Sequence, residues 1–168
     1  MYIETERLIL RNFTDTDISN ATRYLGDNDV MQYVEKPFSK EQVTKFIKSF
    51  GLCEPPLIYA LVERQTNLLI GHIIFHAFDT TSIYELGWII DKPYWGKGYC
   101  MEISKVIIDY AFYDIKIEKL IAETVAENSK SLLLIKRLGM VETDTSDGLK
   151  IFSLTNSNLI NEYNLQNK

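Results

Sequence analysis

The chain has few of the features that mark secreted, membrane or disulfide-stapled proteins. Its 168 residues include only two cysteines, Cys53 and Cys100, which are too few for a disulfide framework and form no C-x-x-C pair. The opening residues, MYIETER, carry charges where a secretion signal needs an apolar run. No apolar stretch approaches the roughly 20 residues of a membrane-spanning helix. We therefore expect a reduced, cytoplasmic protein with no membrane partner.

Basic residues and histidines are also scarce. The chain has 18 Lys and Arg against 23 Asp and Glu, a net charge of −5, and an acidic surface binds nucleic acid poorly. His72 and His76 would lie about 13 Å apart on one strand, too far to share a metal ion. No other cluster has the spacing of metal ligands. We expect no nucleic-acid partner and no metal, although a base role for a single histidine stays open beside simple packing.

The length and composition favour one folded domain. A chain with 46% hydrophobic residues can bury a sizeable core without disulfides or a structural metal. We assign residues 1–156 to this domain and the polar, Asn-rich residues 157–168 to a C-terminal tail. A homodimer is compatible with the sequence.

The first half of the chain predicts a strand, two helices and a meander. Residues 7–11 have a strand-like composition, and residues 14–17 are rich in residues that begin helices. Ser39 followed by Gln42 has the spacing of a capping box, so a second helix should begin there. Three strand-like runs, separated by short turns, should pair antiparallel and cover residues 57–63, 68–78 and 83–91.

The second half alternates helices and strands. Apolar residues at helical spacing predict a helix after Gly98, and Gly139 should end another. Strands are expected at residues 120–126 and 150–154. This order requires parallel pairing in the middle of the sheet. The predicted class is α/β (α+β), with a mixed, mostly antiparallel sheet of about 6–7 strands flanked by helices.

The loop between the third meander strand and the following helix contains the residues that indicate a binding function. It reads DKPYWGKGYC over residues 91–100, with Gly96 and Gly98 just before the helix and Lys97 between them. Glycines and a helix N-terminus together form an anion site suited to a pyrophosphate. The spacing of the glycines and the lysine matches neither the Walker motif nor the dinucleotide-binding motif. On these residues alone, a turn without any ligand remains the alternative.

Four ordered segments resemble a known family. They are TERLILR (5–11), ELGWII (85–90), YWGKGYCME (94–102), and NSKS (128–131) continuing to KRLGM (136–140). The sequence is similar to the GNAT superfamily of acyl-CoA-dependent N-acetyltransferases, and most similar to the branch of ribosomal-protein N-terminal acetyltransferases. The resemblance covers about residues 5–154 and implies the GNAT fold, in which the fourth and fifth strands splay apart.

The resemblance implies acetyl-CoA as cosubstrate. A primary amine would attack the thioester directly in a ternary complex, without a covalent acyl-enzyme, and the acceptor would be a protein N-terminus or a small amine. Backbone amides of the loop would hold the pyrophosphate, and the strand before it would pair with the pantetheine arm. The implied cofactor-binding residues are Ile89, Ile90, Trp95, Gly96, Lys97, Gly98, Tyr99, Cys100, Asn128 and Ser131.

Two residues are candidates for the chemical step. Glu85 shares a strand face with Gly87 and would take the proton from the amine, unless it is only a partly exposed strand residue or a structural ion-pair residue. Ser131 would hydrogen-bond the CoA sulfur, or only the backbone of its own helix. Many relatives have a tyrosine where Ile135 stands, so a side-chain general acid is in doubt. That substitution also motivates a rival function, a non-catalytic acyl-CoA-binding sensor or scaffold.

Two further features have alternative interpretations. Cys100 begins a helix, which would lower its pKa and make it reactive, or it is a packed small residue. An aromatic set either lines the acceptor pocket, as the resemblance implies, or forms ordinary core; its members are Tyr24, Tyr33, Phe38, Phe46 and Phe50.

Overall fold

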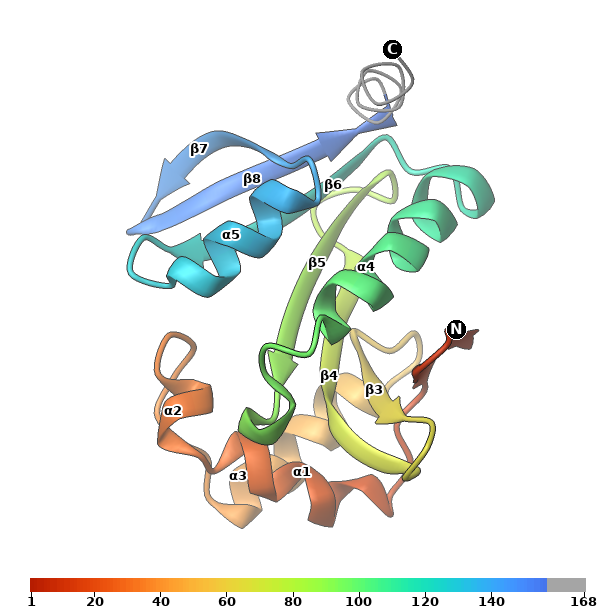
Figure 1. Ribbon diagram of the computed structural model, residues 1–168, viewed down its shortest axis with the longest axis vertical. Coiled ribbons are helices and arrows are strands. Elements are labelled where there is room, and N and C mark those ends of the chain that lie inside the picture. Colours follow the sequence, from red (N-terminus) through yellow and green to blue (C-terminus); the bar gives the residue numbers. More distant parts are fainter. Residues whose placement is uncertain (157–168) are drawn as a thin grey trace. The chain divides into compact units, whose positions relative to one another are not determined.

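Eight strands form the sheet of the computed structural model, which describes residues 1–156. The strand order is β1-β2-β3-β4-β5-β6-β8-β7, mostly antiparallel and flanked by helices (Figure 1). The predicted fold class is therefore confirmed, with one or two strands more than expected. The tail assigned to residues 157–168 lies outside the described residues, and the single-domain assignment stays a prediction.

Backbone contacts divide the chain into two compact units. The first contains Met1–His76 and Gly87–Ile103, and the described part of the second contains Ala77–Leu86 and residues 104–156. Strand β5 (Ile83–Ile90) and helix α4 (Tyr99–Asp109) each contribute residues to both units.

The first unit contains the N-terminal antiparallel strands and three helices. Its strands are β1 (Ile3–Glu4), β2 (Leu8–Arg11), β3 (Ile58–Glu63) and most of β4 (Leu68–Ala77). Its helices are α1 (Asp17–Leu25), α2 (Asn28–Met31) and α3 (Lys40–Phe46), which continues into the π-helical turn η1 (Ile47–Gly51). Figure 1 shows α1 and α3 beside β3 and β4, and residues of all four share one hydrophobic core.

Local sequence signals explain where the first helices begin. Ser39 and Gln42 form the predicted capping box at the start of α3. Helix α1 begins differently, because Thr16 makes no side-chain cap. Instead the buried carboxylate of Asp17 accepts hydrogen bonds from the Thr14 backbone and hydroxyl, both at 2.8 Å, and from the Arg11 guanidinium at 2.7 and 2.9 Å.

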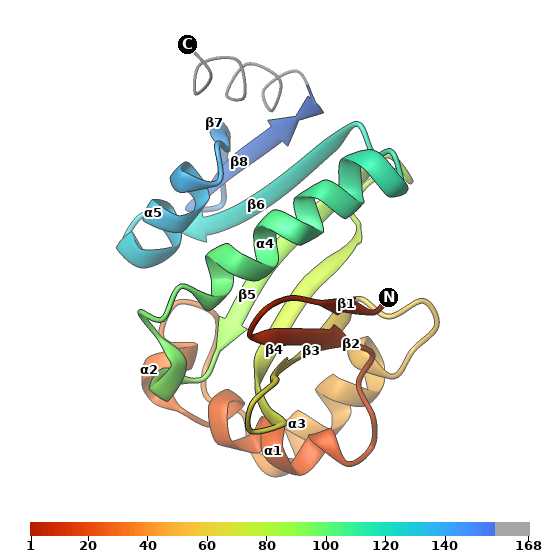
Figure 2. The same ribbon diagram turned by 45° about the vertical axis from the view of Figure 1, so that its right-hand side comes forward.

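The second unit contains the parallel pair that the sequence predicts. Ile83 and Glu85 of β5 pair in parallel with Lys119 and Ile121 of β6 (Lys119–Val125). Strand β8 (Leu149–Thr155) pairs antiparallel with β6 and with β7 (Val141–Ser146). Helix α5 (Ser129–Arg137) packs beside β6, as Figure 2 shows, and Gly139 ends it with a left-handed φ of +77°.

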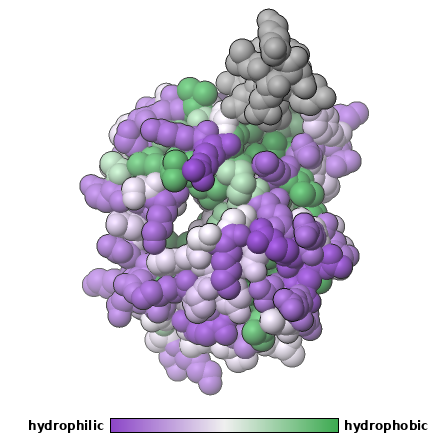
Figure 3. Space-filling model, in the orientation of Figure 1, coloured by the Kyte–Doolittle hydropathy of each residue, from purple (hydrophilic) through white to green (hydrophobic). Residues whose placement is uncertain are grey.

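Helix α4 passes into a second π-helical turn, η3 (Tyr110–Asp114). Hydrophilic residues cover most of the face shown in Figure 3, in keeping with the 24% of charged residues. Within residues 1–156, no helix has both the length and the apolar character needed to cross a bilayer.

Candidate active site

The loop between β5 and α4 has the backbone form of an anion-binding turn. After the short 3-10 helix η2 (Lys92–Tyr94), Gly96 and Gly98 take left-handed φ values of +72° and +79°, and α4 begins at Tyr99. Only glycine adopts such angles without strain. Residues 96–98 are exposed, and the space beside Gly96 is open. Backbone N–H groups at the start of α4 lack helical partners, so this turn can accept an anion.

At the end of β5, the backbone groups of successive residues point toward opposite edges of the strand. The Ile89 carbonyl lies so close to β4 that a Cβ at Gly71 would be 2.2 Å from its oxygen, and the Asp91 N–H donates to the Ile70 carbonyl at 2.8 Å. Since successive backbone groups of a strand point to opposite edges, the main chain of Ile90 faces away from β4. Of the two residues expected to pair with pantetheine, Ile90 is the one whose backbone groups point away from β4.

Trp95 connects this edge to the loop. Its indole Nε1 donates a 2.7 Å hydrogen bond to the Ile90 carbonyl, and its ring packs against the core of the first unit. The predicted cofactor-binding Trp95 therefore also holds the turn against the strand that precedes it.

Ion pairs from α1 and α2 hold the same loop. The Arg23 guanidinium bonds the buried Asp91 carboxylate at 2.5 Å and the Leu69 carbonyl at 3.0 Å. Lys92 forms an ion pair with Asp29. Sequence reasoning missed these partners because they lie far along the chain from the loop, and no local pattern connects them.

Glu85 lies in the second unit, half-buried on β5. Its register partner on β6 is Ile121, so Glu123, two residues further on, lies on the same face. Burial and the negative charge of Glu85 raise the pKa of Glu123. The sheet therefore places two carboxylates on one face, and Glu123 was not anticipated from the sequence.

A pocket of about 550 Å³ lies in the second unit, beside Glu123. Its apolar lining includes Ile121 and Ile151. Its charged lining is mostly acidic and consists of Asp79, Lys119, Glu123, Asp144 and Asp147. A negative, partly apolar pocket of this kind suits a cationic group better than an anion.

Asn128 and Ser131 lie at the start of α5, also in the second unit. Asn128 is the N-cap residue, and its Oδ1 accepts the Ser131 backbone N–H at 3.2 Å. The amide nitrogen of Asn128 is a donor and takes no part in that bond. Ile135, on the same helix, is fully buried. It provides no titratable group at the position where many relatives have tyrosine.

Two of the reactive groups considered above lie in environments that disfavour their charged forms. Burial raises the pKa of the Cys100 thiol to about 12, which argues against a reactive thiolate and favours the packed-residue interpretation. Burial also lowers the pKa of His72 to about 3. Its Nδ1 lies 2.9 Å from the hydroxyl of the buried Tyr24, so His72 is a core residue rather than a base.

The aromatic set divides between core and surface. Tyr24 is fully buried, and the Phe46 ring lies 5.5 Å from Phe38 and 5.2 Å from Phe50, measured between ring centroids. Tyr33 and Phe50 are each 40% exposed. Most of the set therefore packs the helices against the sheet, in line with the ordinary-core interpretation.

Comparison with known proteins agrees with this geometry. Residues 7–141 match the family model of the acetyltransferase (GNAT) domain. The "Uncharacterized N-acetyltransferase YnaD" of Bacillus subtilis (strain 168) is 32% identical over 142 residues, which is 83% of this chain and 82% of that protein. An acetyltransferase (GNAT family) from Bacillus anthracis is 26% identical, with a TM-score of 0.85 over 92% of this chain and 98% of that chain.

A more distant structure has the same fold. The ribosomal-protein-S5-alanine acetyltransferase from Vibrio fischeri is 19% identical, with a TM-score of 0.75 over 93% of this chain and 97% of that chain. Together with the family match over residues 7–141, these likenesses show that the chain belongs to the GNAT family and is an acetyl-CoA-dependent acetyltransferase.

Proposed function

We propose that this enzyme moves an acetyl group from acetyl-CoA to a primary amine by direct attack in a ternary complex. The observation that carries the proposal is the left-handed Gly96–Gly98 turn, which joins the end of β5 to the start of α4. Within the family, the four sequence segments favour the branch of the ribosomal-protein N-terminal acetyltransferases, which we include in the proposal. The distant structural likeness to one such enzyme supports the fold alone.

The donor groups of the loop fit a pyrophosphate. Backbone N–H groups from Gly96 to Cys100 would bind its oxygens, and Lys97 adds a positive charge beside them. The main-chain N–H of Ile90, facing away from β4, would hydrogen-bond the pantetheine arm. The Ile90 carbonyl accepts from Trp95, and the Ile89 carbonyl faces β4, so Ile89 would contact the arm less directly than the sequence led us to expect. Trp95, Tyr99 and the packed Cys100 would shape the turn. In the second unit, Asn128 would donate to the pantetheine and Ser131 to the CoA sulfur.

The acceptor amine needs to lose a proton before it attacks. Glu85 would accept this proton, directly or through water. Glu123 on the same sheet face adds a second negative charge, which favours binding of the ammonium form before deprotonation. The acidic lining of the neighbouring pocket supports a cationic acceptor, either a protein N-terminus or a small amine.

An assay of binding and turnover together tests the proposal. Acetyl-CoA is titrated by calorimetry, and thiol release is followed over a panel of N-terminal peptides, polyamines and aminoglycosides. Saturable binding with CoA release for one amine class is the expected result. Saturable binding without release over the whole panel would favour the sensor or scaffold, for which the buried Ile135 in place of a tyrosine is the motivating observation. Absence of acetyl-CoA binding would overturn both.

A further inference from the structure

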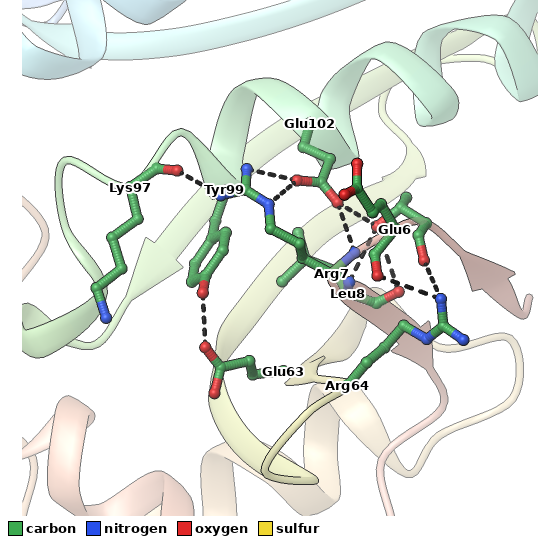
Figure 4. A network of polar contacts seen from close by, with 9 residues as sticks. Glu6, Arg7, Leu8, Glu63, Arg64, Lys97, Tyr99 and Glu102 are labelled. Carbon is green, nitrogen blue, oxygen red and sulfur yellow. Dashed lines mark hydrogen bonds and ion pairs between the residues drawn. The ribbon is translucent and has the colours of Figure 1, made fainter.

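Arg7 contacts the glycine loop from a distant part of the sequence. Its Nη1 donates to the Lys97 carbonyl at 2.9 Å, and its Nε and Nη2 bind the Glu102 carboxylate at 2.6 and 2.5 Å (Figure 4). The guanidinium also lies over the Tyr99 ring, 4.7 Å from its centroid. One side chain therefore contacts the loop, the first residue of α4 and the first turn of that helix.

The other ends of this network are also anchored. The Tyr99 hydroxyl donates to Glu63 at the end of β3 at 2.6 Å. Glu102 accepts from the Thr5 hydroxyl at 2.6 Å and from the Arg7 backbone at 3.0 Å. The segment at residues 5–7 and the start of α4 are thus joined by both main-chain and side-chain bonds, which hold the guanidinium in one place.

The bond to Lys97 fixes the orientation of a single peptide plane. In a trans peptide, the carbonyl of one residue and the N–H of the next point in opposite directions. Because Arg7 holds the Lys97 carbonyl, the Gly98 N–H points away from Arg7. Because Gly98, at φ +79°, has no Cβ, this peptide is easier to rotate than one that precedes any other residue. Without Arg7, the carbonyl oxygen could turn toward a bound anion and repel it.

The ion pair also offsets an unfavourable charge. Glu102 lies in the first turn of α4, close to the turn that would bind an anion. Although burial raises the pKa of Glu102, hydrogen bonds from Thr5 and Arg7 hold it below its usual range, so the carboxylate stays charged. The Arg7 guanidinium balances this negative charge, which would otherwise oppose binding of a pyrophosphate.

We propose that Arg7 is a positioning residue for the CoA pyrophosphate, acting through the Lys97–Gly98 peptide plane and the Glu102 carboxylate. Its guanidinium directs the Gly98 N–H toward the bound pyrophosphate and need not touch the pyrophosphate itself. The inference rests on the proposed function, because it assumes that the turn binds acetyl-CoA.

The test compares three substitutions of Arg7 with a matched control. Arg7→Ala removes every contact, Arg7→Lys keeps the charge but not the planar fork, and Arg7→Gln keeps a donor if the alanine variant fails to fold. Arg11→Ala is the control, since Arg11, four residues further along the chain in β2, makes a comparable ion pair with Asp17, and its hydrogen bonds go to Asn12 and Asp17. Melting temperature monitors folding in each variant.

Two measurements follow the loop directly. Calorimetry gives the Kd of acetyl-CoA. With ¹⁵N-labelled glycine, an NMR spectrum contains at most eight backbone amide signals, one for each glycine of the chain. The Gly98 signal is identified as the one that is missing from the spectrum of Gly98→Ala. We expect acetyl-CoA to shift the Gly98 amide in the wild-type protein. Folded Arg7 variants, including Arg7→Lys, should raise Kd by about tenfold and reduce this shift, since a charged hydrogen bond is lost.

The outcomes separate the inference from the proposed function. Wild-type protein that does not bind acetyl-CoA would overturn the proposed function and the inference with it. Normal wild-type binding, with unchanged Kd and Gly98 shift in Arg7→Ala, would overturn the inference alone. If Arg7→Lys binds acetyl-CoA as tightly as wild type, only the charge of Arg7 matters. If Arg11→Ala weakens acetyl-CoA binding as much as the Arg7 variants do, Arg7 contributes only general stability. Either result would also overturn the inference.

Discussion

Gly98 and Gly148 have nearly the same backbone conformation in different settings. Their φ values are +79° and +82°, but Gly98 belongs to the candidate pyrophosphate turn and Gly148 to the turn between β7 and β8. A Cβ at Gly98 would meet nothing nearer than the Arg7 Nη2, 3.7 Å away, and a Cβ at Gly148 would meet nothing within 4 Å. The two positions therefore separate backbone strain from the function of the turn.

We predict that alanine at either glycine lowers the free energy of unfolding by about 1 kcal/mol, because a left-handed φ strains any residue with a Cβ. Only Gly98→Ala should raise the Kd of acetyl-CoA, since the strain shifts the N–H groups of the turn. Urea unfolding and calorimetry on the two variants check this. Equal affinities would show that the turn does not bind the cosubstrate.

Glu85 gives the second prediction at the scale of single residues. Glu85→Gln removes the proposed base while keeping the size of the side chain, so turnover should fall by about 10²- to 10⁴-fold. The Kd of acetyl-CoA should change little. The measurement is the rate of thiol release with the acceptor found in the panel, across pH. Unchanged rates at every pH would remove Glu85 from the mechanism and leave it as a structural residue.

The strands and helices show which patterns the sequence reveals. Alternating or continuous apolar residues predicted β2 to β6 and β8. The missed elements lack such patterns: β1 has two residues, α2 has four, and every residue of β7 is exposed. The glycine turn was predictable because its angles and its helix start are local. The Arg7–Glu102 pair spans 95 residues and depends on the folded arrangement, so no local pattern reveals it.

Helix α1 provides a prediction at the scale of an element. Although burial raises the pKa of Asp17, hydrogen bonds from Arg11 and Thr14 lower it below its usual range. A depressed folded-state pKa contributes stability above the unfolded value near 3.8, and this is lost as pH falls through the folded pKa. Asp17→Asn should therefore cost about 2 kcal/mol at pH 7.

The difference between wild type and Asp17→Asn should shrink as pH falls below about 4. Urea unfolding at several pH values measures it. A difference that stays constant down to pH 2 would mean that packing around the start of α1, rather than the charge of Asp17, stabilises the helix.

His72 affects the stability of the whole molecule in acid. It is 1% exposed, and its neighbours include Tyr24, Phe13 and Phe46 in the main core of the first unit. Protonation would place a charge among these rings. The buried imidazole therefore stays neutral from its usual pKa of 6.5 down to about 3. The unfolded chain binds a proton in that window and the folded chain does not, so acid favours unfolding.

From this residue alone, the free energy of unfolding should fall by up to about 1.4 kcal/mol per pH unit between pH 6 and pH 4. His72→Gln can still hydrogen-bond Tyr24 but cannot take up a proton in that range. It should lower stability at pH 7 and show a shallower decline in acid. Chemical unfolding of both proteins at pH 7, 6, 5 and 4 gives the two slopes. Equal slopes would mean that carboxylates set the acid sensitivity, and that water reaches the His72 ring in the folded protein.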